Sequence, residues 1–494
     1  MRLAAPFIAG IAVAALAVAP AVAKTTVSLG MQQEPTVLDP TVDATAAINV
    51  MLANQVYESL ATQAQTGEII PQLAASWTVS EDGLNYVFTL REGVTFHDGA
   101  PMTADTVRFS FERAKAEGSE NPRRVWFEAI ESIETPDPLT VEITLKAADS
   151  FFLWSLAQGP ASIVHPDSVE NNVTAPVGTG PWKYDSWTRG DRLTLARNED
   201  HRDFDPGQIE RLEFRFIADP SSAVAALLSG DLDAYPGMPA PETLAQFEAD
   251  PRFTVAVGTT NGEVILALNH SKPPFDDLRV RRAISHALDR QEIIDGAYYG
   301  YGEPIGTFFP PHDPAYVDLT SAYPLDHDAA KALLAEAGHP DGLAVSLRLP
   351  PFPYARRSGE IIQSQLAKIG VTANIENVEW AFWIGEVFRE KNYDMTIIAH
   401  TEANDLGNFA RGPDYYWGYD NPEFNALWDA IRAEADPARR DALLQDAQRM
   451  VTEDAVHGFL FQLPALGVYR TELSGYWTSS PTLHSPRHEM RWTN

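Results

Sequence analysis

The sequence predicts a mixed α/β fold organised in two or three domains. Short segments such as VEITLK at 141–146 alternate apolar and polar residues, which is typical of half-buried strands. Other segments place apolar side chains three and four residues apart, which predicts helices with one buried face. The chain has 494 residues, more than one hydrophobic core usually serves, so we expect more than one domain.

The N-terminal residues are typical of a secretory signal. Arg2 is followed by an apolar run over 7–19 and by the small residues Ala21 and Ala23. A membrane anchor needs roughly 20 apolar residues, whereas this run is shorter and ends at Pro20. We therefore predict cleavage near Ala23 and export to a bacterial periplasm. No later segment has a long uncharged apolar run, so the mature protein is not expected to be membrane-embedded.

Charge and cysteine content exclude several classes of function. The 68 acidic and 37 basic residues give a formal net charge of −31, which argues against binding to nucleic acid or to an anionic membrane. The chain has no cysteine, which excludes disulfides, thiolate metal sites, a cysteine nucleophile and a lipid anchor on cysteine. We expect a free, monomeric exported protein.

The first third of the chain contains clear element signals. A strand is expected from Thr25, and apolar residues at 48, 52, 56 and 60 predict an amphipathic helix over 45–60. Alternating runs on either side of Asp82-Gly83 predict a hairpin. Thr103 precedes a segment with helical spacing and is a candidate N-cap.

The middle of the chain continues this alternation. A second strand pair is expected on either side of 136–138, and a strand is expected after the Gly-Pro turn at 180–181. Residues 211–235 then follow the order strand, turn, helix, strand. We find no tandem repeat and no long linker.

The stretch KPPFDDLRVRRAISHALDR at 272–290 concentrates four arginines in this acidic chain. Asp276 and Asp277 are candidate caps, and Asp277 with Arg281 has the spacing of a favourable i,i+4 ion pair. The expected apolar face comprises Val280, Ala283, Ile284, Ala287 and Leu288. The arginines lie mostly off that face, which favours a capped surface helix over an anion site.

Four blocks of this sequence carry a family resemblance. They are 73–114, 177–187 with its Gly-Thr-Gly-Pro turn, 264–311, and 329–342 with its Pro-Asp-Gly turn. In that order they resemble the extracellular solute-binding proteins of the peptide/nickel type, which serve ATP-driven (ABC) importers. The resemblance covers essentially the whole mature chain.

The resemblance implies the two-lobed fold of a type II periplasmic binding protein with an extra inserted domain. After the signal peptide at 1–23, domain I would comprise 24–65, 176–262 and 471–494. Domain II would be the inserted segment 66–175, and domain III would be 263–470. Such a protein captures a solute by lobe closure, delivers it to the permease subunits of the importer, and needs no cofactor.

A search for enzyme chemistry finds no recognised motif. HEMRW at 488–492 lacks the second histidine of a zinc protease, and no Gly-x-Ser-x-Gly elbow or phosphate loop occurs. The turn GYGEPIG at 300–306 has one residue too many for a dinucleotide loop. The 12 histidines are scattered, so no metal site is predicted. We expect a protein that is not an enzyme; a secreted hydrolase with an unrecognised carboxylate pair is the alternative from another class.

Aromatic residues in domain III are candidates for stacking on a ligand. The segment 377–424 contains two aromatic groups, and core packing is the alternative role for each ring. The candidates are Trp380, Phe382, Trp383, Tyr415, Tyr416 and Trp417.

The charged candidates follow from the resemblance. Peptide-binding members carry a tryptophan and, three residues later, an aspartate that binds the peptide's amino terminus; this sequence has His400 and Ala403 in that register. Glu402 or Asp405 would replace the missing carboxylate. Arg356 or Arg357 would bind a carboxylate or instead cap the following helix, although the family's carboxylate-binding position falls nearer Leu349.

We therefore predict a receptor for a peptide or amino-acid-derived solute. An oligosaccharide or glycoside is the second expectation, because aromatic residues are plentiful and the usual amine anchor is absent. A metal chelate held through His400 is the third.

Overall fold

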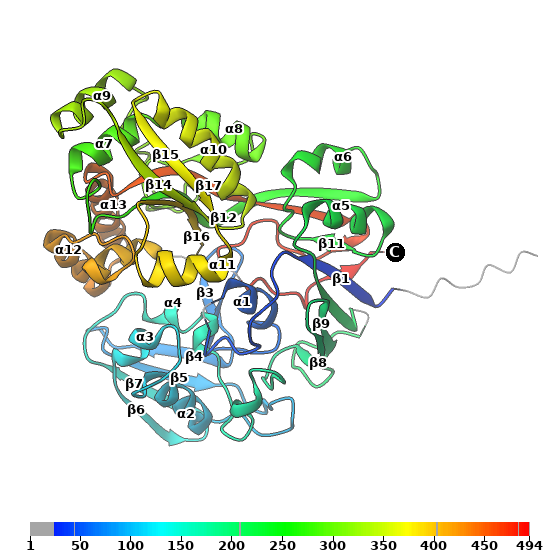
Figure 1. Ribbon diagram of the computed structural model, residues 1–494. Coiled ribbons are helices and arrows are strands. Elements are labelled where there is room, and N and C mark those ends of the chain that lie inside the picture. The colour runs from blue at the N-terminus through cyan, green and yellow to red at the C-terminus, as the bar shows by residue number, and fades with distance from the viewer. Residues whose placement is uncertain (1–23, 44, 207–208, 402–403, 483, 494) are drawn as a thin grey trace, which may run out of the picture.

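The computed structural model describes residues 24–43, 45–206, 209–401, 404–482 and 484–493. Its central feature is a mixed sheet of eleven strands in the order β15-β14-β16-β12-β17-β11-β1-β10-β9-β8, with β13 beside β17 (Figure 1). The strands are β1 (Thr26–Met31), β8 (Trp182–Thr188), β9 (Arg192–Arg197), β10 (Arg211–Phe216), β11 (Ala234–Tyr235), β12 (Phe253–Leu268), β13 (Glu303–Pro304), β14 (Leu343–Leu349), β15 (Val371–Asn377), β16 (Met395–His400) and β17 (His457–Arg470).

Two long antiparallel strands, β12 and β17, run through both halves of this sheet. The C-terminal end of β17 pairs with β11, whereas the C-terminal end of β12 pairs with β16. The register between β12 and β17 shifts between Thr259 and Glu263, which locally bends and twists the pair. We call the half that contains β14 to β16 the second lobe and the remainder of the molecule the first lobe.

Helices cover both faces of the sheet in the second lobe (Figure 1). Successive residues of β12 alternate between the two cores, with Val264 and Leu266 on one face and Ile265 and Ala267 on the other. On the first face lie α7 (Leu278–His286), α8 (Arg290–Tyr298), α9 (His327–Glu336) and α10 (Pro353–Ala367). On the second, more aromatic face lie α11 (Trp380–Phe382), η4 (Trp383–Arg389), η5 (Asp405–Asp414), α12 (Pro422–Ala433) and α13 (Pro437–Glu453).

The first lobe contains a separate four-stranded sheet in the order β4-β5-β7-β6. Its strands are β4 (Ala74–Val79), β5 (Asn85–Leu90), β6 (Ile130–Asp137) and β7 (Thr140–Leu145), covered by α2 (Ala104–Lys115), α3 (Arg124–Glu128) and α4 (Phe152–Ser155). All of these elements fall within the segment 66–175 expected as an inserted domain, and the exact domain boundaries stay a prediction. The hairpin at Gly83 and the N-cap Thr103 are confirmed.

The remaining elements connect or flank these sheets. They are α1 (Ala46–Leu52), β2 (Ala61–Gln63), β3 (Ile69–Pro71), η1 (Gly159–Ala161), η2 (Val169–Asn171), α5 (Pro220–Ser229), η3 (Pro241–Thr243), α6 (Leu244–Glu248), β18 (Leu473–Ser474) and β19 (Arg491–Trp492). The predicted strand, helix and strand at 211–235 are confirmed as β10, α5 and β11.

The helix predicted over 45–60 is wrong in length, because α1 ends at Leu52. Asn54 adopts a left-handed backbone with φ of 60°, which breaks the helical path. The carbonyls of Gln55 and Val56 instead accept hydrogen bonds from Trp182 and Gly180, at 3.0 and 2.9 Å. The apolar side chains of Val56 and Leu60 are nevertheless buried. Their spacing therefore reflects burial and does not indicate a helix.

The arginine-rich stretch forms α7, with Asp277 as its N-cap and the predicted apolar face buried. The expected pair between Asp277 and Arg281 is wrong, because Asp277 binds Arg279 at 2.6 Å. Arg281 is buried and donates to the carbonyls of Phe275 and Asp454, at 2.9 and 3.0 Å. Asp454 caps the C-terminus of α13, where free carbonyls favour a cation.

Candidate functional site

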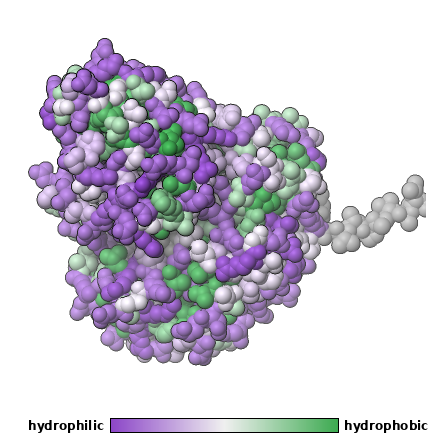
Figure 2. All heavy atoms as spheres, viewed as in Figure 1, coloured by the Kyte–Doolittle hydropathy of each residue, from purple (hydrophilic) through white to green (hydrophobic). Residues whose placement is uncertain are grey.

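A cavity of about 350 Å³ lies between the two lobes. This volume falls in the range of pockets that hold small organic ligands. On the face seen in Figure 2, the mostly hydrophilic surface is hollowed between the upper and lower parts, and apolar residues gather there. The lining combines apolar walls with a few polar groups and includes Met31, Val50, Met238, Asn261, Tyr354, Thr401, Leu466, Trp477, Thr482 and Arg487.

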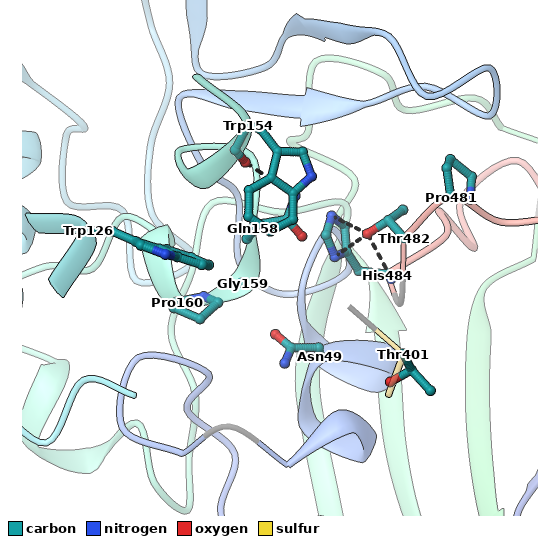
Figure 3. Close-up of a pocket in the computed structure, with 10 residues that line it drawn as sticks. All are labelled: Asn49, Trp126, Trp154, Gln158, Gly159, Pro160, Thr401, Pro481, Thr482 and His484. Carbon is teal, nitrogen blue, oxygen red and sulfur yellow. Dashed lines mark hydrogen bonds between the residues drawn. The ribbon is translucent and has the colours of Figure 1, made fainter. Parts of the chain in front are cut away.

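A smaller hollow of about 30 Å³ shares Thr401 and Thr482 with this cavity (Figure 3). On one side Trp126 and Trp154 meet edge to face with ring centroids 5.5 Å apart. On the opposite side Thr482 hydrogen-bonds the ring of His484 at 2.8 Å. Such a set of aromatic edges and neutral polar groups suits amide or hydroxyl groups of a ligand.

The tryptophans of this hollow come from the first lobe, and the sequence analysis did not identify them. Their positions in α3 and α4 carry no spacing that separates a cleft residue from a core residue. No local signal was available either, since Trp126 lies between Val125 and Phe127, and Trp154 between Leu153 and Ser155.

A second pocket of about 30 Å³, in the second lobe, is acidic. Glu263, Asp313 and Asp405 line it together with Asn261, which also lines the large cavity. Glu263 is 3% exposed, and its Oε2 has no hydrogen-bond partner within the described chain. Burial, followed by the charges of Asp405 and Asp313, raises the pKa of Glu263 well above its ordinary value. Such a pocket suits a cationic group.

His400 stands beside this acidic pocket at the end of β16. Its Nε2 lies 3.1 Å from the hydroxyl of Tyr416, and its Nδ1 lies 3.5 Å from Asp405. Asp405 also accepts a hydrogen bond of 2.9 Å from Asn408. The structure thus brings together His400, Asp405 and Tyr416, three of the residues proposed from the sequence. Glu402 lies outside the described residues.

Three of the six aromatic candidates, all in the second lobe, are almost fully buried. Trp417, Tyr416 and Trp383 are 0%, 1% and 3% exposed. The indole N–H of Trp383 donates to Thr396 at 3.0 Å, and Trp417 stacks on Phe409 with centroids 4.8 Å apart. None of the three lines the cavities described above, so a ligand contact for them stays a prediction.

Arg356 and Arg357 lie in the first turn of α10. Arg356 is 3.9 Å from Glu379, with a side chain that is 42% exposed, whereas Arg357 pairs with Glu242 of the first lobe at 3.0 Å. Neither lines the large cavity, although Pro353 and Tyr354 of the same turn do. Carboxylate binding by Arg356 stays a prediction.

Direct contacts between the lobes also occur between segment 149–151 and α12. The amide of Ser150 donates to the carbonyl of Arg432 at 2.7 Å, and the ring of Phe151 stacks on Trp428 with centroids 5.6 Å apart. In Figure 1 α12 lies at the left edge, away from β12 and β17 at the centre. These contacts join the lobes at a point other than the two shared strands.

Two lobes joined by shared strands, with a ligand-sized cavity between them, define a solute-binding protein. The model of the bacterial extracellular solute-binding proteins, family 5, matches residues 68–427, and the chain belongs to this family. This confirms the resemblance and the fold class inferred from the sequence.

Three relatives illustrate the similarity. The glutathione-binding protein GsiB of Salmonella typhimurium is 27% identical, covering 94% of each chain. The dipeptide-binding protein of Escherichia coli is 29% identical, covering 83% of this chain and 84% of that protein. The solved periplasmic binding protein DppA of Helicobacter pylori, in complex with the peptide STSA, is 26% identical, with a TM-score of 0.86 over 96% of this chain and 99% of that one. These relatives are binding proteins rather than enzymes.

Among the helices of the described residues, none combines the length and apolar character needed to cross a membrane.

Proposed function

We propose that this protein is the periplasmic substrate-binding component of an ABC importer. It captures a peptide or amino-acid-derived solute between its lobes and delivers the solute unchanged to the permease subunits. The export signal at 1–23 is removed near Ala23, and the mature chain acts as a monomer. The observation that carries the proposal is the cavity of about 350 Å³ between the lobes, a size that suits a short peptide.

The polar groups around this cavity support a solute with an amino group. Asp405 takes the role of the amine-binding carboxylate, because it lies in the acidic pocket with Glu263 and Asp313. A buried ammonium needs such a carboxylate partner. His400 positions Asp405 from the side, at 3.5 Å. Glu402, three positions before Asp405 in the sequence, is the second candidate for the same role.

An oligosaccharide or glycoside is the second candidate solute. The observation that favours it is the pair Trp126 and Trp154 beside neutral polar side chains (Figure 3), since sugars stack on aromatic rings and hydrogen-bond through hydroxyl groups.

Thermal unfolding of the mature chain, residues 24–494, tests these proposals. The panel comprises Met-Leu, glutathione, tetrapeptides, maltotriose and a nickel–histidine complex. A ligand at 100 times its dissociation constant adds about 2.7 kcal/mol of stability, which raises the midpoint by several degrees. Stabilisation by peptides, with the peptide recovered intact, supports the proposal. Stabilisation by maltotriose alone supports the second candidate, and cleavage of a stabilising ligand would show a hydrolase.

A further inference from the structure

Arg487 lines the large cavity from the C-terminal segment of the chain. Its side chain is almost fully enclosed, since the residue is only 5% exposed. The backbone at this point is fixed by Gln55, a fully buried side chain of the first lobe. Gln55 accepts the amide N–H of Arg487 at 3.0 Å and donates to the carbonyl of Ser485 at 2.9 Å. The backbone that carries the arginine is therefore held in place before any ligand arrives.

The guanidinium of Arg487 has no anionic partner among the described residues. Its Nε is buried without a hydrogen-bond partner, and it forms no ion pair with a described carboxylate. Burial lowers the pKa of the Arg487 guanidinium, and among the described residues Tyr469 acts in the opposite direction. Other arginines in buried surroundings are compensated, as Arg202 is by Glu58 and Arg281 is by backbone carbonyls.

An arginine stays protonated in proteins, so burial does not remove its charge. A buried charge without a partner is costly, and the cost is relieved when an anion or a set of acceptors enters. The only open space that Arg487 lines among the described cavities is the ligand-sized cavity between the lobes. An anion that relieves this cost therefore has to enter through this cavity.

From this geometry we infer that Arg487 binds a carboxylate group of the solute, and that the solute class is an amino acid derivative or short peptide with a free carboxylate. A planar carboxylate matches the two parallel N–H groups of a guanidinium. The inference rests on the proposed function and adds the residue that binds the carboxylate end of the ligand. The inference assigns the carboxylate to Arg487 and not to Arg356. The side chain of Arg356 is 42% exposed and lines none of the described cavities.

The placement of charges in the cavity agrees with such a solute. Arg487 lines it from the first lobe, whereas the acidic pocket of Glu263, Asp313 and Asp405 adjoins it at Asn261. A ligand with an ammonium group at one end and a carboxylate at the other would satisfy both. Closing the lobes on this ligand would place its carboxylate against Arg487 and its ammonium group against the acidic pocket.

The first test compares a free acid with its amide. Isothermal titration calorimetry of the mature protein uses Met-Leu and Met-Leu amide, with the variants Arg487→Met and Arg487→Lys. We expect wild type to bind the free acid about a hundredfold more tightly than the amide, and Arg487→Met to lose about the same factor for the acid only. Arg487→Lys keeps the charge without the planar fork and should bind the acid at an intermediate level. Arg252→Met is the matched control, because Arg252 is 46% exposed and pairs with Asp250 on the surface.

A second measurement does not depend on the peptide proposal. Sodium acetate supplies the carboxylate alone, and its effect on the unfolding midpoint is compared with that of sodium chloride at equal ionic strength. Acetate should stabilise wild type and Arg252→Met but not Arg487→Met. If peptides fail to bind while acetate acts through Arg487, the peptide proposal fails and the carboxylate site stands. Equal binding of acid and amide by wild type, or an acetate effect that survives in Arg487→Met, would overturn the inference.

Discussion

Asp149 and Arg432 form an ion pair of 2.7 Å between segments that are 283 residues apart in the chain. The aspartate side chain is 12% exposed and the arginine side chain is 41% exposed. The pair lies beside the contacts of Ser150 and Phe151 with α12 and therefore belongs to a latch between the lobes. A latch of this kind stabilises the closed arrangement, in which the solute is enclosed.

Arg432→Ala should shift the protein toward an open state. Losing the pair and its neighbouring contacts reduces the closed population, so the affinity for a stabilising ligand should fall about three- to tenfold. Small-angle X-ray scattering should show a larger radius of gyration for the ligand-free variant than for wild type. The control is Arg439→Ala in α13, because Arg439 is 71% exposed and its partner Glu434 belongs to the same lobe. An unchanged radius and affinity in Arg432→Ala would remove the latch from the closure mechanism.

From the surroundings of Glu58 we expect the stability of the fold to fall at acidic pH. It is 2% exposed, accepts from Thr179 at 2.9 Å and from Arg202 at 3.1 Å, and lies 3.5 Å from His201. Burial alone would raise its pKa, but the neighbouring His201 ring and the charge and hydrogen bond of Arg202 outweigh burial and lower the pKa from 4.5 to about 2. The carboxylate therefore stabilises the fold above about pH 4.5, and this stabilisation is lost as the pH falls from 4.5 through about 2.

Glu58→Gln tests this relation by urea unfolding at pH 7 and pH 3. At pH 7 the variant should lose about 3 kcal/mol of unfolding free energy, because Arg202 keeps its charge without its buried partner. The loss should be smaller at pH 3, where wild type has lost part of the same contribution. Glu81→Gln in the exposed turn before Gly83 is the control. A loss that stays constant between the two pH values would contradict the lowered pKa of Glu58.

The aromatic core of the second lobe predicts a contrast between Trp417 and Tyr416. Removing the fully buried indole in Trp417→Ala should cost about 3 to 5 kcal/mol of stability. Tyr416→Phe keeps the ring and loses only the bond to His400, so about 1 kcal/mol is expected. Chemical unfolding measures both, with Phe382→Ala as the control because that side chain is 45% exposed. If Trp417→Ala left stability unchanged but abolished ligand binding, Trp417 would be a ligand contact rather than a core residue.

The Gly-Thr-Gly-Pro turn predicts a steric effect at Gly180. A Cβ atom at this position would lie 2.2 Å from the carbonyl oxygen of Gln55, a backbone atom that cannot rotate away. Gly180→Ala should therefore destabilise the fold by about 1 to 3 kcal/mol. Gly385→Ala in η4 is the matched control, because no atom lies within 4 Å of its added Cβ. Thermal unfolding compares the two, and equal midpoints would show that the backbone at Gln55 gives way.

The local elements could be predicted from the sequence where short-range chemistry decides them. The Asp82-Gly83 turn, the Thr103 cap and the Asp277 cap depend on residues within a few positions of one another, and the structure contains all three. The helix over 45–60 failed because the carbonyls of Gln55 and Val56 bond to residues about 125 positions away. The spacing of apolar residues indicates which side chains are buried. It does not indicate which distant residues hydrogen-bond the backbone carbonyls.

The site was predicted only in part for the same reason. His400, Tyr416 and Asp405 lie within 16 residues in the chain, and the structure brings their side chains together. Glu263, Trp126 and Arg487 were not identified, because a single acidic, aromatic or basic residue among many carries no local pattern.

The sequence by itself predicted an export signal, and it determined the absence of cysteine chemistry, the alternation of strands and helices, and the order of blocks that places the chain in its family. Each of these can be recognised in the sequence without knowing which distant residues meet in the fold. Tertiary structure alone decided that Arg487 is buried without a carboxylate partner among the described residues, that Glu263 meets Asp313 and Asp405, and that Asp149 meets Arg432. These relations join segments separated by 50 to several hundred residues, and their energy depends on solvent exclusion and mutual distance, which arise only when the chain has folded.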